Sequence, residues 1–291
     1  MDLAEVTDRI AAADHVFDPV GKPVADAVRA VLPQGPVRDA LQGTWLGHPL
    51  HPMLTDVVIG AWTSSFLLDF VGGHRSRRAS ERLLAVGILA AVPTVASGLA
   101  DWSTLQRRDQ RVGLVHAASN AAATGTYFLS YRARRKGHHL RGVAWGVVGA
   151  TVASVGGYLG GHLAYSRDAG ANHSLPSEGP VEWTEVDVGP NPAREGPIQV
   201  DVEGAKVVVA HDEDGLHALG DICSHQGGPL HEGELVDSCI RCPWHGSEFR
   251  LRDGSVRHGP AAVPEPLYEV RDGDPVALRM VRPSVPAEPP Y

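Results

Sequence analysis

Cysteine is scarce in this chain, with only three residues among 291. Three thiols cannot build the set of disulfides that holds a small secreted domain together, so the sequence does not predict a protein of that class. Two of them, Cys223 and Cys242, each stand two or three positions before a histidine. Cys239 has no such neighbour and is expected to be a small buried or loop thiol.

An excess of positive charge is also missing. The formal net charge is −8, and residues 181–291 carry 20 acidic and 9 basic side chains, a net of −11. An acidic segment without a basic stripe argues against nucleic acid as a partner. The rest of the chain has a net charge of about +3, and its total length suggests about two domains. The uneven charge suggests a membrane part joined to a soluble part.

Two short pairs of residues, Cys223-Ser224-His225 and Cys242-Pro243-Trp244-His245, supply two thiolates and two imidazoles. Such a set can hold a tetrahedral zinc ion, and it is also the ligand set of a Rieske [2Fe–2S] centre, in which two His replace two Cys on one iron. Scattered residues without a metal are the third possibility. Glycine follows each histidine within two positions and no helical period follows, which favours the iron–sulfur centre over a zinc finger.

Residues 181–282 resemble the Rieske family around these pairs. The resemblance implies that Cys223 and Cys242 bind a buried iron, whereas His225 and His245 bind an outer iron near the surface. It also implies that Ser247 donates a hydrogen bond to a cluster sulfur. The expected fold is an all-β antiparallel sandwich with two cluster-binding loops.

The chain departs from the respiratory form of that family at three positions. Gly228 and Trp244 stand where the respiratory form has a disulfide between its cluster loops, and Phe249 replaces a tyrosine that donates to the cluster. Because hydrogen bonds to the sulfurs raise the potential, one donor out of two predicts an intermediate value within the range of roughly −150 to +300 mV.

Long stretches between residues 48 and 166 carry no charge. Residues 83–100, 112–131 and 142–166 are charge-free, and residues 53–72 have charges only near their two ends. About 20 apolar residues cross a bilayer as a helix, so we expect a four-helix transmembrane bundle. The alternative is a soluble bundle, since many of these residues are small. Residues 1–47 lack a long apolar run and are expected to be a polar segment without a signal peptide.

The sequence His48-Pro49-Leu50-His51-Pro52 opens the first of these helices. With the residues that follow, it resembles the start of an uncharacterised bacterial four-helix membrane domain that would cover about residues 40–165. The resemblance implies no activity.

Four histidines are expected near one end of the helices: His48, His51, His116 and His162. Histidines within a membrane domain are candidate ligands or proton relays. They could hold a haem from two helices or bind a quinone, or they could only hydrogen-bond backbone and water.

Lysine and arginine predict the orientation in the cell membrane, because short cytoplasmic loops are rich in both. They gather in the loops after the first and third expected helices. These residues are Arg75, Arg77, Arg78, Arg82, Arg132, Arg134, Arg135, Lys136 and Arg141. In a multi-pass bundle of four helices both loops would be cytoplasmic, and the Rieske domain would face outward.

The expected layout is a polar segment (1–47), a membrane domain (48–166), a linker (167–180), a Rieske domain (181–282) and a disordered tail (283–291). A membrane-anchored protein that transfers single electrons fits this layout best, with a redox protein or quinone as partner and lipid around the helices. A ferredoxin-like donor to an oxygenase system is the main alternative, and a redox sensor is a third. The 46 residues after His245 contain only His258, too few ligands for the second iron site of a catalytic oxygenase.

Overall fold

The computed structural model describes residues 2–174, 179–189 and 196–281, so the expected tail lies outside the described residues. The chain divides into two compact units. The bundle unit consists of Met1–Pro33 and Pro49–Gly170, and the β unit consists of Gln34–His48 and Ala171–Tyr291. Residues 34–48 precede the long helices in the sequence but belong to the β unit.

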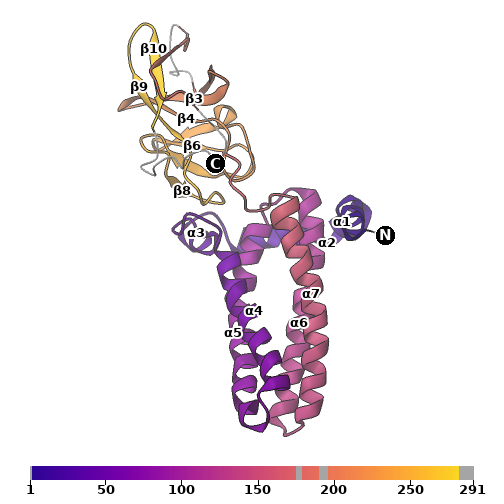
Figure 1. Ribbon diagram of the computed structural model, residues 1–291. Helices are drawn as coiled ribbons and strands as arrows, with labels where there is room; N and C mark the ends of the chain where they lie inside the picture. The colour runs from indigo at the N-terminus through magenta and orange to yellow at the C-terminus, as the bar shows by residue number, and fades with distance from the viewer. Residues whose placement is uncertain (1, 175–178, 190–195, 282–291) are drawn as a thin grey trace. The chain divides into compact units, whose positions relative to one another are not determined.

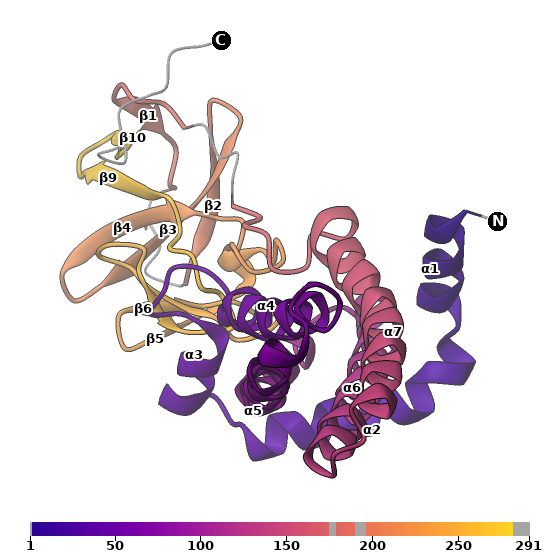
Figure 2. The ribbon, with the colours of Figure 1, turned by 60° about the horizontal axis from the view of Figure 1, so that its bottom comes forward.

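Four long helices form the centre of the bundle unit (Figure 1). They are α4 (Leu50–Val71), α5 (Arg77–Trp102), α6 (Arg107–Arg135) and α7 (His139–Ser166), with the short 3₁₀ helix η1 (His74–Ser76) between α4 and α5. Helix α4 packs mainly on α5, and α6 packs mainly on α7, so the bundle consists of two antiparallel hairpins. Figure 2 shows the four helices obliquely, from one end of the bundle.

Seven α-helices are present in the described residues: the four long ones that the sequence predicts and three shorter ones within residues 1–47. The additional ones are α1 (Leu3–Ala12), α2 (Asp14–Val31) and α3 (Pro36–Gln42). Helices α1 and α2 pack against α6, where Arg111 forms an ion pair with Asp18 at 2.8 Å. The sequence did not reveal α1 as part of the bundle because its apolar face is short.

Three helical segments are long and apolar enough to cross a membrane: Leu50–Val71, His74–Trp102 and His139–Ser166. Between 22% and 33% of the residues in their most apolar windows are buried within the protein, so most of each apolar surface points outward, as a lipid-facing helix requires. Helix α6, which contains the expected third span 112–131, does not meet the same measure of apolarity. Several of its polar residues face the interior, among them Gln110 and Ser130.

Aromatic residues fill the contact between the two hairpins. Trp62 of α4 stacks on Tyr127 of α6 with ring centres 4.2 Å apart. Gly87 of α5 makes room for the indole, because a Cβ there would lie 2.2 Å from its Nε1. The cluster also includes Val58, Leu84 and Ala91.

A buried ion pair crosses the bundle near its other end. Arg134 of α6 donates to both carboxylate oxygens of Asp69 of α4, each at 2.6 Å, and to Ser80 of α5 at 2.8 Å. The side chains of Arg134 and Asp69 are only 3% and 4% exposed. Removing one partner would leave an uncompensated buried charge, which costs far more than losing a surface pair.

We therefore expect Asp69→Asn or Arg134→Met alone to lower the free energy of unfolding by about 3–5 kcal/mol, and the double variant to cost less than the sum. Denaturant unfolding of the detergent-solubilised protein measures this. Arg9→Ala is the control, because its pair with Glu5 is exposed and should contribute less than about 1 kcal/mol. Additive costs in the double variant would contradict the coupling.

The β unit holds two antiparallel sheets, which confirms the expected all-β fold. The larger has the strand order β1-β10-β9-β4-β3-β2, and the smaller has the order β5-β6-β7-β8. The larger sheet contains β1 (Thr184–Val186), β2 (Ile198–Val202), β3 (Ala205–Asp212), β4 (Gly215–Gly220), β9 (Leu267–Arg271) and β10 (Val276–Met280). The smaller contains β5 (Glu234–Val236), β6 (Cys239–Arg241), β7 (Glu248–Arg250) and β8 (Val256–His258).

Each sheet contributes to its own hydrophobic core. One core packs side chains of β2, β3, β4, β9 and β10, including Val200, Val207 and Leu278. The other fills the space beside the smaller sheet and includes Cys223, Cys242 and Phe249. Strand β3 serves both cores because its side chains alternate, with Val207 and Val209 in the first core and Val208 and Ala210 in the second.

Candidate cluster-binding site

The two Cys–His pairs lie on loops with the same backbone hydrogen-bond pattern. The first loop follows β4, and the second joins β6 to β7. In the first, the N–H of Gly227 donates to the carbonyl of Cys223 and the N–H of Cys223 donates to Gly228. In the second, the N–H of Gly246 donates to Cys242, and the N–H of Cys242 donates to the carbonyl of Ser247. Gly227 and Gly246 have φ of +74° and +77°, a conformation that favours glycine.

The four predicted ligands come together as two pairs. The thiols of Cys223 and Cys242 are buried and hydrogen-bonded to one another. The rings of His225 and His245 lie edge-to-face with centres 5.0 Å apart. Among the described residues, no three His, Cys, Asp or Glu side chains converge as ligands of one ion would. A pair of sulfurs beside a pair of imidazoles fits a centre of two irons, each of which takes two protein ligands.

The environment of His225 and Cys242 favours the forms that bind metal, whereas the hydrogen bond with Cys242 and burial raise the pKa of the Cys223 thiol. The hydrogen bond from the Cys223 thiol lowers the pKa of Cys242 to about 7, assisted by the N–H groups of Trp244 and His245. Burial lowers the pKa of His225 to about 3, with added repulsion from His245, His173 and Arg38, so its imidazole is neutral at neutral pH. Thiolate and neutral imidazole are the ligand forms, and a partly ionised thiol loses its proton readily to a metal.

Gly228 leaves room for the ligands. A Cβ at this position would lie 2.8 Å from the Sγ of Cys242 and 3.1 Å from the indole of Trp244. The indole, which is half exposed, therefore packs where a side chain on the first loop would stand. The chain thus has no space for a cross-link between residues 228 and 244.

A third loop, between β8 and β9, binds both cluster loops, and the sequence did not reveal its role. The hydroxyl of Ser224 donates to the carbonyl of Val263 at 2.7 Å, and the N–H of Ser224 donates to Glu265 at 2.6 Å. On the other side, the N–H of Ala261 donates to the hydroxyl of Ser247 at 3.0 Å. No motif signalled this loop, because it acts mainly through backbone groups.

Glu265 is an unusual member of this loop. It is 3% exposed, and burial raises its pKa to about 8 in spite of the hydrogen bond from the N–H of Ser224. Residues 181–291 contain 20 acidic side chains, and no sequence motif distinguishes Glu265 from the others.

The segment 34–48 also contributes to the site. The carboxylate of Asp39 in α3 lies 2.7 Å from Nδ1 of His258 and accepts the N–H of Gly259 at 2.9 Å. The amide of Gln34 donates to the carbonyl of Gly246 on the second cluster loop at 2.6 Å. Residues from the polar N-terminal segment therefore hold the second and third loops. The helix itself was foreseeable from Pro36 at its first position, but its docking surface was not.

The bundle brings together two of the four membrane histidines. The rings of His51 and His116 lie edge-to-face with centres 6.5 Å apart. His162 has its Nε2 buried without a hydrogen bond to any described residue, and its ring lies 6.2 Å from Tyr158 of the same helix. His48 belongs to the β unit.

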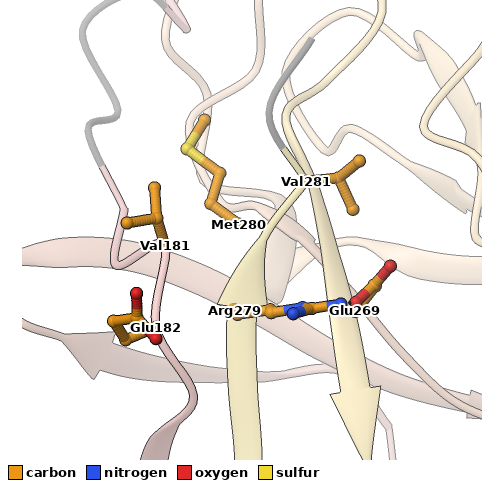
Figure 3. A pocket seen from close by; sticks show the side chains of 6 residues that line it. All are labelled: Val181, Glu182, Glu269, Arg279, Met280 and Val281. Atoms are coloured by element: carbon orange, nitrogen blue, oxygen red, sulfur yellow. Dashed lines mark hydrogen bonds and ion pairs between the residues drawn. The ribbon is translucent and has the colours of Figure 1, made fainter. Parts of the chain in front are cut away.

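A hollow of about 340 Å³ lies beside β9 and β10. Its lining is Val181, Glu182, Glu269, Arg279, Met280 and Val281 (Figure 3). Arg279 is paired with Glu269 at 2.5 Å, and no lining residue belongs to the three loops described above. The hollow is not part of the candidate site, because its lining contains no cysteine or histidine.

Comparison with known families agrees with both units. Residues 182–279 match the Rieske [2Fe–2S] domain, and residues 47–173 match a family described as predicted membrane protein (DUF2231). The chain joins a DUF2231 domain to a Rieske domain. The Rieske domain implies a [2Fe–2S] cluster, whose two irons take two thiolates and two imidazoles from the protein.

Several known proteins are similar to the Rieske part. The ferredoxin subunit of anthranilate 1,2-dioxygenase from Burkholderia cepacia is 35% identical over 71 residues, which are 24% of this chain and 66% of that protein. Apoptosis-inducing factor 3 from Mus musculus is 39% identical over 62 residues, 21% of this chain and 10% of that protein. The matched part thus spans about a tenth of that relative. A solved ferredoxin of carbazole 1,9a-dioxygenase from Nocardioides aromaticivorans IC177 is 30% identical, with 33% of this chain and 96% of that chain covered and a TM-score of 0.31.

Gly228→Ala tests the spacing of the two loops. The added Cβ would press on the Sγ of Cys242, and overpacking of this kind costs about 1–3 kcal/mol. We expect a lower free energy of unfolding and a strongly reduced content of iron and acid-labile sulfide in the purified protein.

Gly273→Ala is the matched control. Gly273 lies in the β9–β10 turn, where the nearest atom to a Cβ is a carbonyl oxygen at 3.3 Å. It should keep the wild-type iron content. Full iron content in Gly228→Ala would show that the loops are not as closely packed as described.

Proposed function

We propose that this protein is a membrane-anchored carrier of single electrons. The observation that carries the proposal is the pair of equivalent loops, which bring together two thiols and two imidazoles. In the same chain, apolar helices of membrane-spanning length precede these loops. A [2Fe–2S] cluster bound there supplies a one-electron couple. The remaining parts of the proposal concern what the protein's own residues do.

Cys223 and Cys242 would hold the inner iron, and His225 and His245 the outer one. Both cysteines are within the hydrophobic core, whereas both imidazoles are partly accessible to solvent. The imidazole edges are therefore the shortest route for an electron between the cluster and a partner protein or quinone. The bilayer would hold the apolar surfaces of α4, α5 and α7, with the Rieske domain outside the cell membrane, as the arginine-rich loops indicate.

A ferredoxin-like donor in an oxygenase system is the second candidate. It is favoured by the similarity to the ferredoxin subunit of anthranilate 1,2-dioxygenase. The long apolar helices distinguish the two candidates, since a diffusible donor needs no surface for lipid. A ferredoxin that carries these helices would need its oxygenase partner at the membrane.

Low-temperature EPR of washed membranes tests the proposal. We expect a Rieske signal after reduction in the membrane fraction of cells that make the full chain, and its loss in His225→Ala. His211→Ala is the control, because His211 lies in β3 away from the loops. A signal found only in the soluble fraction would favour the diffusible donor, and wild-type protein without any signal would overturn both candidates.

Ser247 should set part of the cluster potential. Its oxygen accepts the N–H of Ala261, so its hydroxyl proton is available to a further acceptor on the cluster side. The nearby Phe249 is fully buried and has no hydroxyl to add. If the lost bond is stronger to the reduced cluster by about 1–2 kcal/mol, Ser247→Ala lowers the potential by roughly 40–90 mV.

A redox titration followed by EPR measures this shift. Ser255→Ala is the control, because Ser255 lies in the exposed turn between β7 and β8 and bonds Asp253. Equal potentials for Ser247→Ala and wild type would remove Ser247 from the cluster's hydrogen bonds.

A further inference from the structure

His51 and His116 occupy equivalent positions in the two hairpins of the bundle. His51 of α4 has its Nδ1 2.9 Å from the carbonyl of Thr94 in α5. His116 of α6 has its Nδ1 2.8 Å from the carbonyl of Gly156 in α7. Each histidine on the first helix of a hairpin is therefore bonded to the backbone of the second helix.

Glycine makes this contact possible in both hairpins. Gly98 and Gly160 each follow the accepting carbonyl by four residues, one turn along the helix. A Cβ at Gly98 would lie 2.7 Å from the ring of His51, and one at Gly160 would lie 3.0 Å from the ring of His116. Each imidazole rests in the space that a side chain would otherwise fill.

The carbonyl partners determine which ring nitrogen carries the proton. A carbonyl oxygen can only accept, so Nδ1 of each histidine is the donor and Nε2 keeps its lone pair. The amide nitrogen of Asn120 is nearly equidistant from the two ring nitrogens of His116, at 3.4 Å from Nδ1 and 3.2 Å from Nε2, and it donates to the His116 carbonyl at 3.0 Å. An Nδ1–H bonded to a carbonyl is the arrangement that commonly orients a metal-binding histidine.

The separation of the rings suits two ligands on opposite sides of one metal ion. A metal–nitrogen bond of about 2.0–2.1 Å and a further distance of about 1.1 Å to the ring centre would place two such ring centres about 6.3 Å apart. The observed value is 6.5 Å, with the ring planes inclined by 75°. This is too far for a direct contact between the nitrogens and close to the span of one metal.

We propose that His51 and His116 are the two axial ligands of a haem iron held between the hairpins. The described residues place no third His, Cys, Asp or Glu with this pair, so an ion bound here needs its other ligands from elsewhere. A porphyrin supplies four nitrogens in the plane between two axial imidazoles. This site rests on the bundle alone and goes beyond the electron transfer proposed for the Rieske domain.

His162 and His48 lie outside the pair. His162 follows Gly160 by two residues, about 200° around α7, so it is on the face away from His116. This makes His162→Ala a useful control within the same bundle.

The test uses the full-length protein purified in detergent from cells supplied with a haem precursor. We expect about one haem per chain by pyridine haemochrome assay and a b-type band in dithionite-reduced minus oxidised spectra. His51→Ala and His116→Ala should each lose at least tenfold in bound haem, whereas His162→Ala should keep it.

Glycine variants guard against a simple failure to fold. Gly98→Ala and Gly160→Ala should displace the imidazoles and lower the haem content severalfold, although alanine favours the helix more than glycine does. Gly157→Ala on α7, the helix of Gly160, is the matched control, because no atom lies within 4 Å of a Cβ at this position. It should bind haem as wild type does.

Three results would overturn the proposal. They are wild-type protein without haem, unchanged haem in the His51 and His116 variants, and zinc, copper or a quinone bound in place of haem. Cys223→Ser separates this site from the cluster: it should lose the Rieske EPR signal and keep the haem band. Wild-type protein that shows the haem band but no cluster signal would overturn the proposed function and leave the haem site in place.

Discussion

The geometry of the Rieske site depends on backbone hydrogen bonds around the two cysteines. In each loop a carbonyl and an N–H of the cysteine are both bonded within five residues, which turns the chain tightly around the thiol. A glycine with positive φ closes each turn. These bonds bury the cysteines and leave the histidines two or three residues further on at the rim. The asymmetry of the candidate site, with thiols inside and imidazoles outside, follows from this local backbone arrangement.

Neither loop is held by its own strands alone. The β8–β9 loop binds Ser224 on one side and Ser247 on the other, and residues of α3 bind that loop and the second cluster loop in turn. A segment that precedes the membrane helices in the sequence is thus part of the same unit as the cluster. Residues 49–170 of the bundle unit interrupt the chain of the β unit, so the covalent order of the chain links the folding of the two units.

Polar groups inside the bundle are likewise hydrogen-bonded to groups on other helices. Arg134 and Asp69 satisfy one another with Ser80, and the imidazoles of His51 and His116 use backbone carbonyls of the neighbouring helix. In a membrane the alternative to such bonds is an unsatisfied polar group in hydrocarbon, which is costly. Small residues, above all glycine, allow the side chains to reach their partners. Polar residues placed inward also explain why α6 is less apolar than its neighbours although it belongs to the same bundle.

The sequence by itself determined the candidate ligand set, the β character of the C-terminal part and the four long helices. Ligand type and spacing are local, and so are the alternation of Ile198, Val200 and Val202 and the charge-free runs. Only the tertiary structure decided which groups from distant segments meet. Asp39 binds Gly259, and Arg134 pairs with Asp69. The rings of His51 and His116 face one another, and all three pairs join residues at least 40 positions apart. The burial of Glu265 depends on the residues that surround it. Periodicity and motif spacing carry no information on such contacts, because they arise from packing between elements.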